Sequence, residues 1–96
     1  MNIESRHLDI IKAILAKYPY IFYAFGSRVT GNNKQFSDLD LCFFDKIPNN
    51  IILKIEEEFE CSDLPYKVDL VDANTLPQEF LNTIKDNLFC LQKFPT

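Results

Sequence analysis

The segment that most limits the possible folds of this 96-residue chain is the apolar run Tyr-Ile-Phe-Tyr-Ala-Phe at residues 20–25, which lies between Pro19 and Gly26. A short continuous run of aromatic and β-branched side chains is typical of a strand that is buried on both faces. Such a strand has no solvent-facing side, so other elements must cover both faces of its sheet. The sequence therefore predicts a layered fold with this strand inside.

Helices and strands are expected to interleave around this run. Apolar residues at three- and four-residue steps predict an amphipathic helix over residues 3–18 and a second one, capped by Asn49 or Asn50, that reaches Phe59. Alternating patterns predict two more strands, at residues 38–44 and 66–71. We therefore expect an α+β fold, a mixed sheet of three or more strands flanked by helices, in one domain over residues 1–96.

Two further helices are expected. A short one begins at Ser27, directly after the first strand. The last one follows a capping box at residues 75–78. Its apolar positions at helical spacing are Phe80, Leu81, Ile84, Leu88 and Leu91. Phe89, Leu91 and Phe94 cannot all face inward from one helix, so they predict either a contact patch or a tail that folds back onto the core.

Charge and composition exclude some classes of protein. Fourteen acidic residues against ten basic ones give a net charge of −4, so a basic footprint for nucleic acid is missing and nucleic acid is not expected as a direct partner. No apolar run approaches the roughly 20 residues that a membrane span needs, and the N-terminus has no signal-peptide pattern. The three cysteines lack metal-site spacing and predict reduced thiols in a cytoplasmic protein.

The segment after the first strand has the features of a phosphate site. Gly26 and Ser27 would open a short helix, where free backbone N–H groups and the helix dipole favour an anion. Glycine lets a phosphate approach the backbone closely, and Arg28 adds a fixed positive charge. Taken alone, a Gly-Ser pair after a strand is more often a simple turn with a helix cap.

Three aspartates form the second candidate group. Asp38 and Asp40 are two residues apart on a predicted strand, so both point to the same face. If strand 66–71 lies beside strand 38–44, Asp69 joins them. Mutual repulsion of such carboxylates is relieved by a hard cation such as Mg²⁺, although an isolated Asp-x-Asp pair is more often a solvated strand end. Asp72 is the rival for Asp69, but its place before Ala-Asn-Thr favours a turn or cap.

Taken together, these residues resemble a known family. Gly26-Ser27, ten residues, Asp38-x-Asp40 and a later Asp69 resemble the polymerase beta-like nucleotidyltransferase superfamily, in particular its minimal nucleotidyltransferases. Those proteins have about this length, so the resemblance covers nearly the whole chain. It implies a mixed sheet with flanking helices and an enzyme that transfers a nucleoside monophosphate, usually AMP from ATP, with Mg²⁺ and release of pyrophosphate.

The resemblance also implies roles for single residues. Gly26 and Ser27 would bind the β- and γ-phosphates, and a phosphate contact is expected from Arg28. Asp38 and Asp40 would bind both of two Mg²⁺ ions. Asp69 would bind the ion that activates the acceptor hydroxyl, or act as its general base. No catalytic role is expected for His7, which should pack or lie at the surface, or for Cys42, which should fill space beside the site.

The same resemblance implies a partner. The minimal family is typically encoded beside a toxin RNase of the HEPN fold, and its members act as antitoxins of the type VII kind that add AMP to a toxin tyrosine. Two alternatives stay open: a non-catalytic antitoxin that neutralises the toxin by complex formation, and a nucleotidyltransferase for small molecules. Either homo- or hetero-oligomers are compatible with the sequence.

Overall fold

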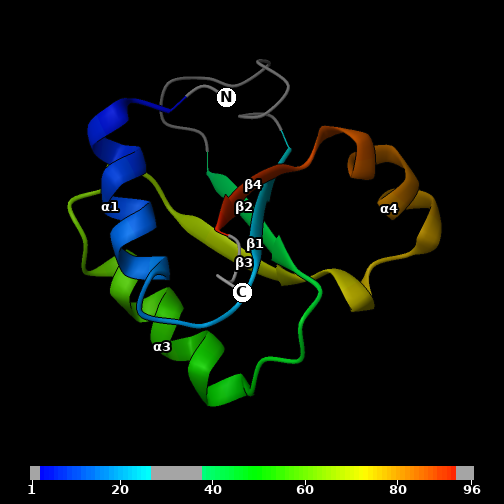
Figure 1. The fold of residues 1–96 in the computed structure, drawn as a ribbon, viewed down its shortest axis with the longest axis horizontal. Coiled ribbons are helices and arrows are strands. Elements are labelled where there is room, and N and C mark those ends of the chain that lie inside the picture. Colours follow the sequence, from blue (N-terminus) through cyan, green and yellow to red (C-terminus); the bar gives the residue numbers. More distant parts are fainter. Residues whose placement is uncertain (1–2, 27–37, 93–96) are drawn as a thin grey trace.

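The computed structural model describes residues 3–26 and 38–92 (Figure 1). The first half of the chain forms α1 (Ser5–Leu15), β1 (Phe22–Phe25), β2 (Leu39–Phe43) and α3 (Asn49–Glu60). The second half forms β3 (Val68–Asp72), the 3₁₀ turn η1 (Ala73–Thr75), α4 (Gln78–Ile84), the 3₁₀ turn η2 (Lys85–Asn87) and β4 (Phe89–Gln92). The helix expected from Ser27 lies outside the described residues.

The strands form one mixed sheet in the order β3-β2-β1-β4. β2 and β3 are parallel, and β1 is antiparallel to both β2 and β4. The crossover from β2 to β3 runs through α3, as a parallel pair requires a connection of this kind. The expected α+β fold with strands 38–44 and 66–71 side by side is therefore confirmed.

The two faces of the sheet are covered by different elements. On one face, α1 and α3 bury the larger hydrophobic core, to which β1 contributes Phe22 and Ala24 (Figure 1). On the other face, η1 and α4 cover a smaller cluster that includes Phe25 and Cys42. Alternate residues of β1 thus pack into different cores, which confirms the prediction of a strand buried on both faces.

The end of the chain departs from the expected helix. α4 ends at Ile84, and residues 89–92 form a fourth strand that pairs with β1. Leu88 and Leu91 are therefore not on a helix, and only the first half of the predicted apolar stripe is helical. In β4, Leu91 is buried in the larger core while Phe89 is 41% exposed. Phe94 lies outside the described residues.

Three predicted details of the helix ends and their packing can also be compared with the structure. Pro48 precedes α3 and Pro77 precedes α4, and neither helix start has a side-chain cap, so the predicted asparagine cap and capping box are wrong. The Thr75 hydroxyl instead donates to the backbone oxygen of Asp72. His7 is buried and packs edge-on against Tyr66, with ring centroids 5.7 Å apart, so of the two expected positions, packed or at the surface, it takes the packed one.

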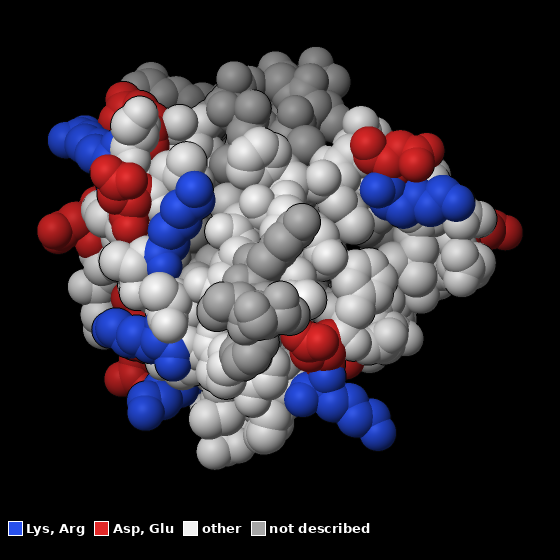
Figure 2. All heavy atoms as spheres, viewed as in Figure 1, with Lys and Arg blue, Asp and Glu red and all other residues white. Residues whose placement is uncertain are grey.

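The distribution of charged side chains on the surface fits the net negative charge of the sequence (Figure 2). On the face shown in Figure 2, acidic and basic side chains are interspersed near the sides of the molecule, and among the described residues no broad basic surface is visible. None of the helices in ranges 3–26 and 38–92 combines the length and apolar character that crossing a membrane requires.

Candidate active site

Two aspartates meet across neighbouring parallel strands. Asp40 of β2 is in register with Asp69 of β3, so the two side chains emerge from the same face of the sheet, next to each other. Asp38 immediately precedes β2 and is exposed. The three predicted acidic residues therefore gather where β2 and β3 begin. This parallel register is what joins residues that are 29 positions apart in the sequence.

The end of β1 completes this edge. β1 runs antiparallel to β2, so its last residue, Phe25, pairs with Asp40. Gly26 follows with φ of +86°, a conformation that L side chains rarely adopt. A Cβ atom at Gly26 would lie 2.9 Å from Oδ2 of Asp40, closer than real Cβ contacts allow. The predicted glycine thus provides both the turn after β1 and the space for the Asp40 carboxylate.

The electrostatics of Asp40 reflect its position. Partial burial raises the pKa of its carboxyl group, and the negative charges of Asp69 and then Asp38 raise this pKa further. The charges of Asp69 and Asp38 therefore both act on the carboxyl group of Asp40. Lys67, directly before β3, offsets part of this charge because its Nζ lies 3.4 Å from Oδ1 of Asp69.

The group of acidic residues has the donor chemistry of a magnesium site. Mg²⁺ prefers carboxylate oxygens and is usually bound by one or two carboxylates together with substrate phosphates. Asp40 and Asp69 supply such a pair, and a cation would relieve the part of the rise in the pKa of Asp40 that comes, after burial, from the neighbouring negative charges. In the described part of the chain, no three His, Cys, Asp or Glu side chains form a ready-made metal cage. The residues thus fit an ion that is shared with a phosphorylated ligand.

The other predicted site residues have different positions. Ser27 and Arg28 lie outside the described residues. Asp72 accepts a hydrogen bond from the backbone N–H of Asn74 at 2.9 Å, which confirms the predicted turn. Cys42 is fully buried, and burial raises the pKa of its thiol to about 11.

One residue of this edge was missed from the sequence. Lys67 stands two positions before Asp69 in an alternating segment, and this spacing predicts that both side chains leave the same side of the chain. That signal was available, but a lysine next to a strand is usually solvated, so the sequence alone gave no reason to select it.

The fold and the acidic edge define a nucleotidyltransferase of the polymerase beta type. The family described as "Polymerase beta, Nucleotidyltransferase" matches residues 9–93, and the chain belongs to this family. More particularly, it is a homologue of the probable protein adenylyltransferase MntA of Haemophilus influenzae (strain ATCC 51907 / DSM 11121 / KW20 / Rd). The two sequences are 37% identical over 97 residues, which cover 97% of this chain and 85% of that protein.

Solved structures show the same fold. One is described as the crystal structure of "the toxin-antitoxin with AMP-PNP"; it matches with a TM-score of 0.66 and 22% identity, over 88% of this chain and 72% of that one. A mutant of the toxin-antitoxin MntA-HpeT matches with a TM-score of 0.61 and 18% identity, over 88% and 71% of the two chains. The expected minimal nucleotidyltransferase resemblance is confirmed.

Proposed function

We propose that this chain, as a single catalytic domain, transfers AMP from ATP to a hydroxyl group of a partner protein. The acceptor we favour is a tyrosine of a HEPN-type toxin, so that the chain acts as a cytoplasmic antitoxin of the type VII kind. The observation that carries this proposal is the register of Asp40 with Asp69, with Asp38 and Gly26 beside them. A chain that only binds its partner gains nothing from repelling carboxylates held together.

The comparisons support the proposal in two ways. The homologue from Haemophilus influenzae is named a probable protein adenylyltransferase, and it aligns with nearly the whole chain. The structures of similar fold are toxin-antitoxin proteins, one of them with the ATP analogue AMP-PNP. The name of the homologue supports the transfer of an adenylyl group to a protein, and the descriptions of the two structures support a toxin as the partner.

The proposed reaction is an in-line displacement at the α-phosphorus of ATP. A bond forms between the acceptor oxygen and the α-phosphorus, while the bond to the oxygen bridging the β-phosphorus breaks and pyrophosphate leaves. The acceptor hydroxyl gives its proton to Asp69 or to water. The backbone of Gly26, together with Ser27 and Arg28, would hold the departing phosphates.

Asp38, Asp40 and Asp69 would hold two Mg²⁺ ions against the triphosphate. Bound Mg²⁺ supplies neutralisation of the phosphate charge and a lower pKa for the attacking hydroxyl. The protein's own part is positioning, because phosphoryl-type transfer depends mainly on geometry and fixed charge. Antiparallel β1 and parallel β3 hold Gly26 and Asp69 on either side of Asp40, so the site is built on the sheet.

Label transfer tests the proposal. The purified chain is mixed with the product of the neighbouring gene, Mg²⁺ and ATP labelled on the α-phosphate. We expect label on the partner, none with Asp38→Asn, and full labelling with Asp72→Asn. The last variant is a matched control, since it changes the same charge on a residue whose carboxylate is engaged in a turn. Tight binding without label for the wild-type chain would favour the non-catalytic antitoxin, and label on a small molecule instead would favour the other alternative.

A further inference from the structure

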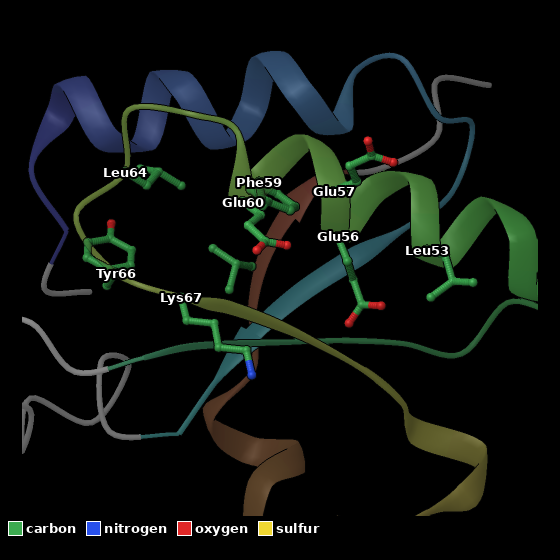
Figure 3. A pocket seen from close by; sticks show the side chains of 9 residues that line it. Leu53, Glu56, Glu57, Phe59, Glu60, Leu64, Tyr66 and Lys67 are labelled. Atoms are coloured by element: carbon green, nitrogen blue, oxygen red, sulfur yellow. The ribbon is translucent and has the colours of Figure 1, made fainter.

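A groove lies between α3 and β3, away from the glycine turn. It has a volume of about 630 Å³, and α3 forms one wall while the segment leading into β3 forms the other (Figure 3). Its lining combines apolar and acidic side chains, including Leu53, Glu56, Glu60, Leu64, Tyr66 and Lys67. Figure 3 shows Glu56 and Glu60 extending from α3 toward β3, with Leu53 at one end of the groove and Leu64 and Tyr66 at the other.

The lining offers two kinds of contact. Buried Phe59 and Val68 form an apolar floor, and Leu53 at one end of the groove adds an apolar side chain that is 58% exposed. Glu56 and Glu60 line the same space with negative charge. An apolar floor next to unneutralised carboxylates suits a ligand that is both apolar and cationic.

The acidic residues are not explained by the stability of the helix. The C-terminal end of a helix favours positive charge, yet α3 ends in Glu-Glu-Glu-Phe-Glu with no basic residue in its last turn. Glu58 is compensated, because Lys17 and Tyr18 both donate hydrogen bonds to it. Within the described residues, Glu56 and Glu60 have no such ion pair. Acidic side chains that lower the stability of a helix end and are not compensated by ion pairs are typical of a binding surface.

The groove also lies along β3, the strand that carries Asp69. β3 is an edge strand of the sheet, so no further strand of the described chain covers its outer side. Lys67 lines the groove, but its ammonium group points away from α3 and pairs with Asp69 (Figure 3). A segment bound in the groove would therefore lie along the strand that carries Asp69 on its opposite face.

We propose that this groove docks a basic, amphipathic segment of the protein that carries the acceptor hydroxyl. The inference rests on the proposed function, since it assigns the partner's binding surface for that reaction. Lysine or arginine side chains of the segment would face Glu56 and Glu60, and its apolar residues would cover Leu53 and the floor. The same carboxylates repel phosphate groups, so nucleic acid is a poor occupant.

Charge reversal in the groove tests this. The test variant is Glu56→Lys with Glu60→Lys, and the matched control is Asp9→Lys with Asp86→Lys. The control makes the same change of net charge at two exposed residues outside the groove. The groove variant is expected to fold, because lysine near the end of α3 interacts favourably with the helix dipole. Circular dichroism and thermal unfolding of both variants verify this before binding is measured.

Titration calorimetry then measures two affinities, for the partner protein and for ATP with Mg²⁺. We expect the groove variant to bind the partner at least about tenfold more weakly than the control variant, with unchanged ATP affinity. Wild-type affinity for the partner should fall with added salt, and that dependence should be smaller in the groove variant. In transfer assays the loss should appear in KM for the partner rather than in kcat.

The outcomes separate this inference from the proposed function. If the wild-type chain transfers label but the groove variant binds the partner as well as the control does, the groove proposal is overturned and the proposed function stands. If the wild-type chain binds without transferring label, the proposed function fails. The groove is then tested by comparing the partner affinity of the groove variant with that of the control variant. A concentration-dependent dimer of the wild-type chain that the groove variant abolishes, with partner affinity unchanged, would identify a second copy as the occupant and overturn the proposal.

Discussion

Gly26 and Asp40 are in such close contact that a methyl group on Gly26 would lie 2.9 Å from Oδ2 of the aspartate. This contact joins the two parts of the sequence pattern, the glycine turn after β1 and the acidic start of β2. The antiparallel pairing of Phe25 with Asp40 produces it. The glycine is therefore required twice, for its positive φ and for the room it leaves.

The first prediction concerns Gly26→Ala. Alanine at a positive φ costs about 1–2 kcal/mol, and its Cβ would also displace the Asp40 carboxylate. We expect lower stability and a severe loss of AMP transfer. A double-mutant cycle with Asp40→Ala separates the two causes, measured by urea unfolding. If the steric contact matters, Gly26→Ala should cost less stability when Asp40 is already alanine; equal costs in both backgrounds would leave backbone strain as the only cause.

The second prediction concerns Asp40→Asn. Burial and two neighbouring negative charges raise the pKa of Asp40 in the folded chain, so its ionised form opposes folding. This cost is present above the raised folded-state pKa and disappears as the pH falls below it. Asp40→Asn should therefore be at least as stable as the wild-type chain at pH 7, and the two should converge in acid.

The same variant should lose activity. A proposed metal ligand should matter at least as much as the residues that merely orient such ligands, whose loss costs up to about 100-fold. We expect AMP transfer to fall by at least that factor while thermal unfolding shows a folded chain. An unfolded Asp40→Asn variant would mean that this carboxylate has a structural role, and the proposed site would then be wrong.

The sequence was sufficient for the elements that its periodicity specifies strongly. Phe22, Ala24 and Phe25 stand in a continuous apolar run, and the structure buries all three. The neighbourhood of Asp40 and Asp69 followed from two alternating segments, once the strands were assumed to be adjacent. Adjacency itself could not be derived from local pattern, because a parallel pair depends on a long connection.

The last strand was mispredicted as part of a helix because the helical spacing of apolar residues continues past the residue at which the helix ends. Leu81, Ile84 and Leu88 keep helical spacing, but the helix stops before the last of them, and Asp86 and Asn87 form part of a 3₁₀ turn. Asp and Asn favour such local turns because their side chains compete for backbone hydrogen bonds. What makes residues 89–92 a strand is pairing with the open edge of β1, and no local window of the sequence contains that information.

The third prediction concerns Gln92, the last residue of this strand. Its Nε2 donates to the backbone oxygens of three residues around the end of α1, at 2.7–3.1 Å: Leu15, Tyr18 and Tyr20. The oxygens of Leu15 and Tyr18 also accept from the backbone N–H groups of Tyr18 and Tyr20, so the Gln92 side chain adds to these hydrogen bonds and ties the end of α1 to the sheet. Gln92→Met keeps the side chain's bulk and removes its donors.

We expect Gln92→Met to lower the free energy of unfolding by about 0.5–1.5 kcal/mol, the usual net contribution of a hydrogen bond, because the Leu15 and Tyr18 oxygens keep their backbone donors. Gln78→Met is the control, because Gln78 makes only an exposed hydrogen bond to Asn82 and should change stability by less than about 0.5 kcal/mol. Urea unfolding measures both. Equal, small effects of the two substitutions would show that β4 is held by strand pairing and packing alone.

The fourth prediction concerns Glu58, which joins α3 to the end of α1. Lys17 donates to one of its carboxylate oxygens at 2.5 Å, and the Tyr18 hydroxyl donates to the other. Hydrogen bonds from Lys17 and Tyr18 lower the pKa of Glu58 below its usual 4.5. A carboxylate with a lowered folded-state pKa stabilises the fold above pH 4.5, and this contribution is lost as the pH falls through the folded-state value.

The glutamate can therefore be tested by its pH dependence. Glu58→Gln should be less stable than the wild-type chain at pH 7, by about 1 kcal/mol or less because the pair is partly exposed, and the difference should shrink as the pH falls well below 4.5. Glu57→Gln, at the neighbouring exposed position, is the control for the loss of one negative charge from α3. Unfolding in urea across pH 3–7 measures both differences. A gap for Glu58→Gln that stays constant over this range would indicate that it arises from packing or from the neutral hydrogen bond, and that the charge of Glu58 does not hold α1 and α3 together.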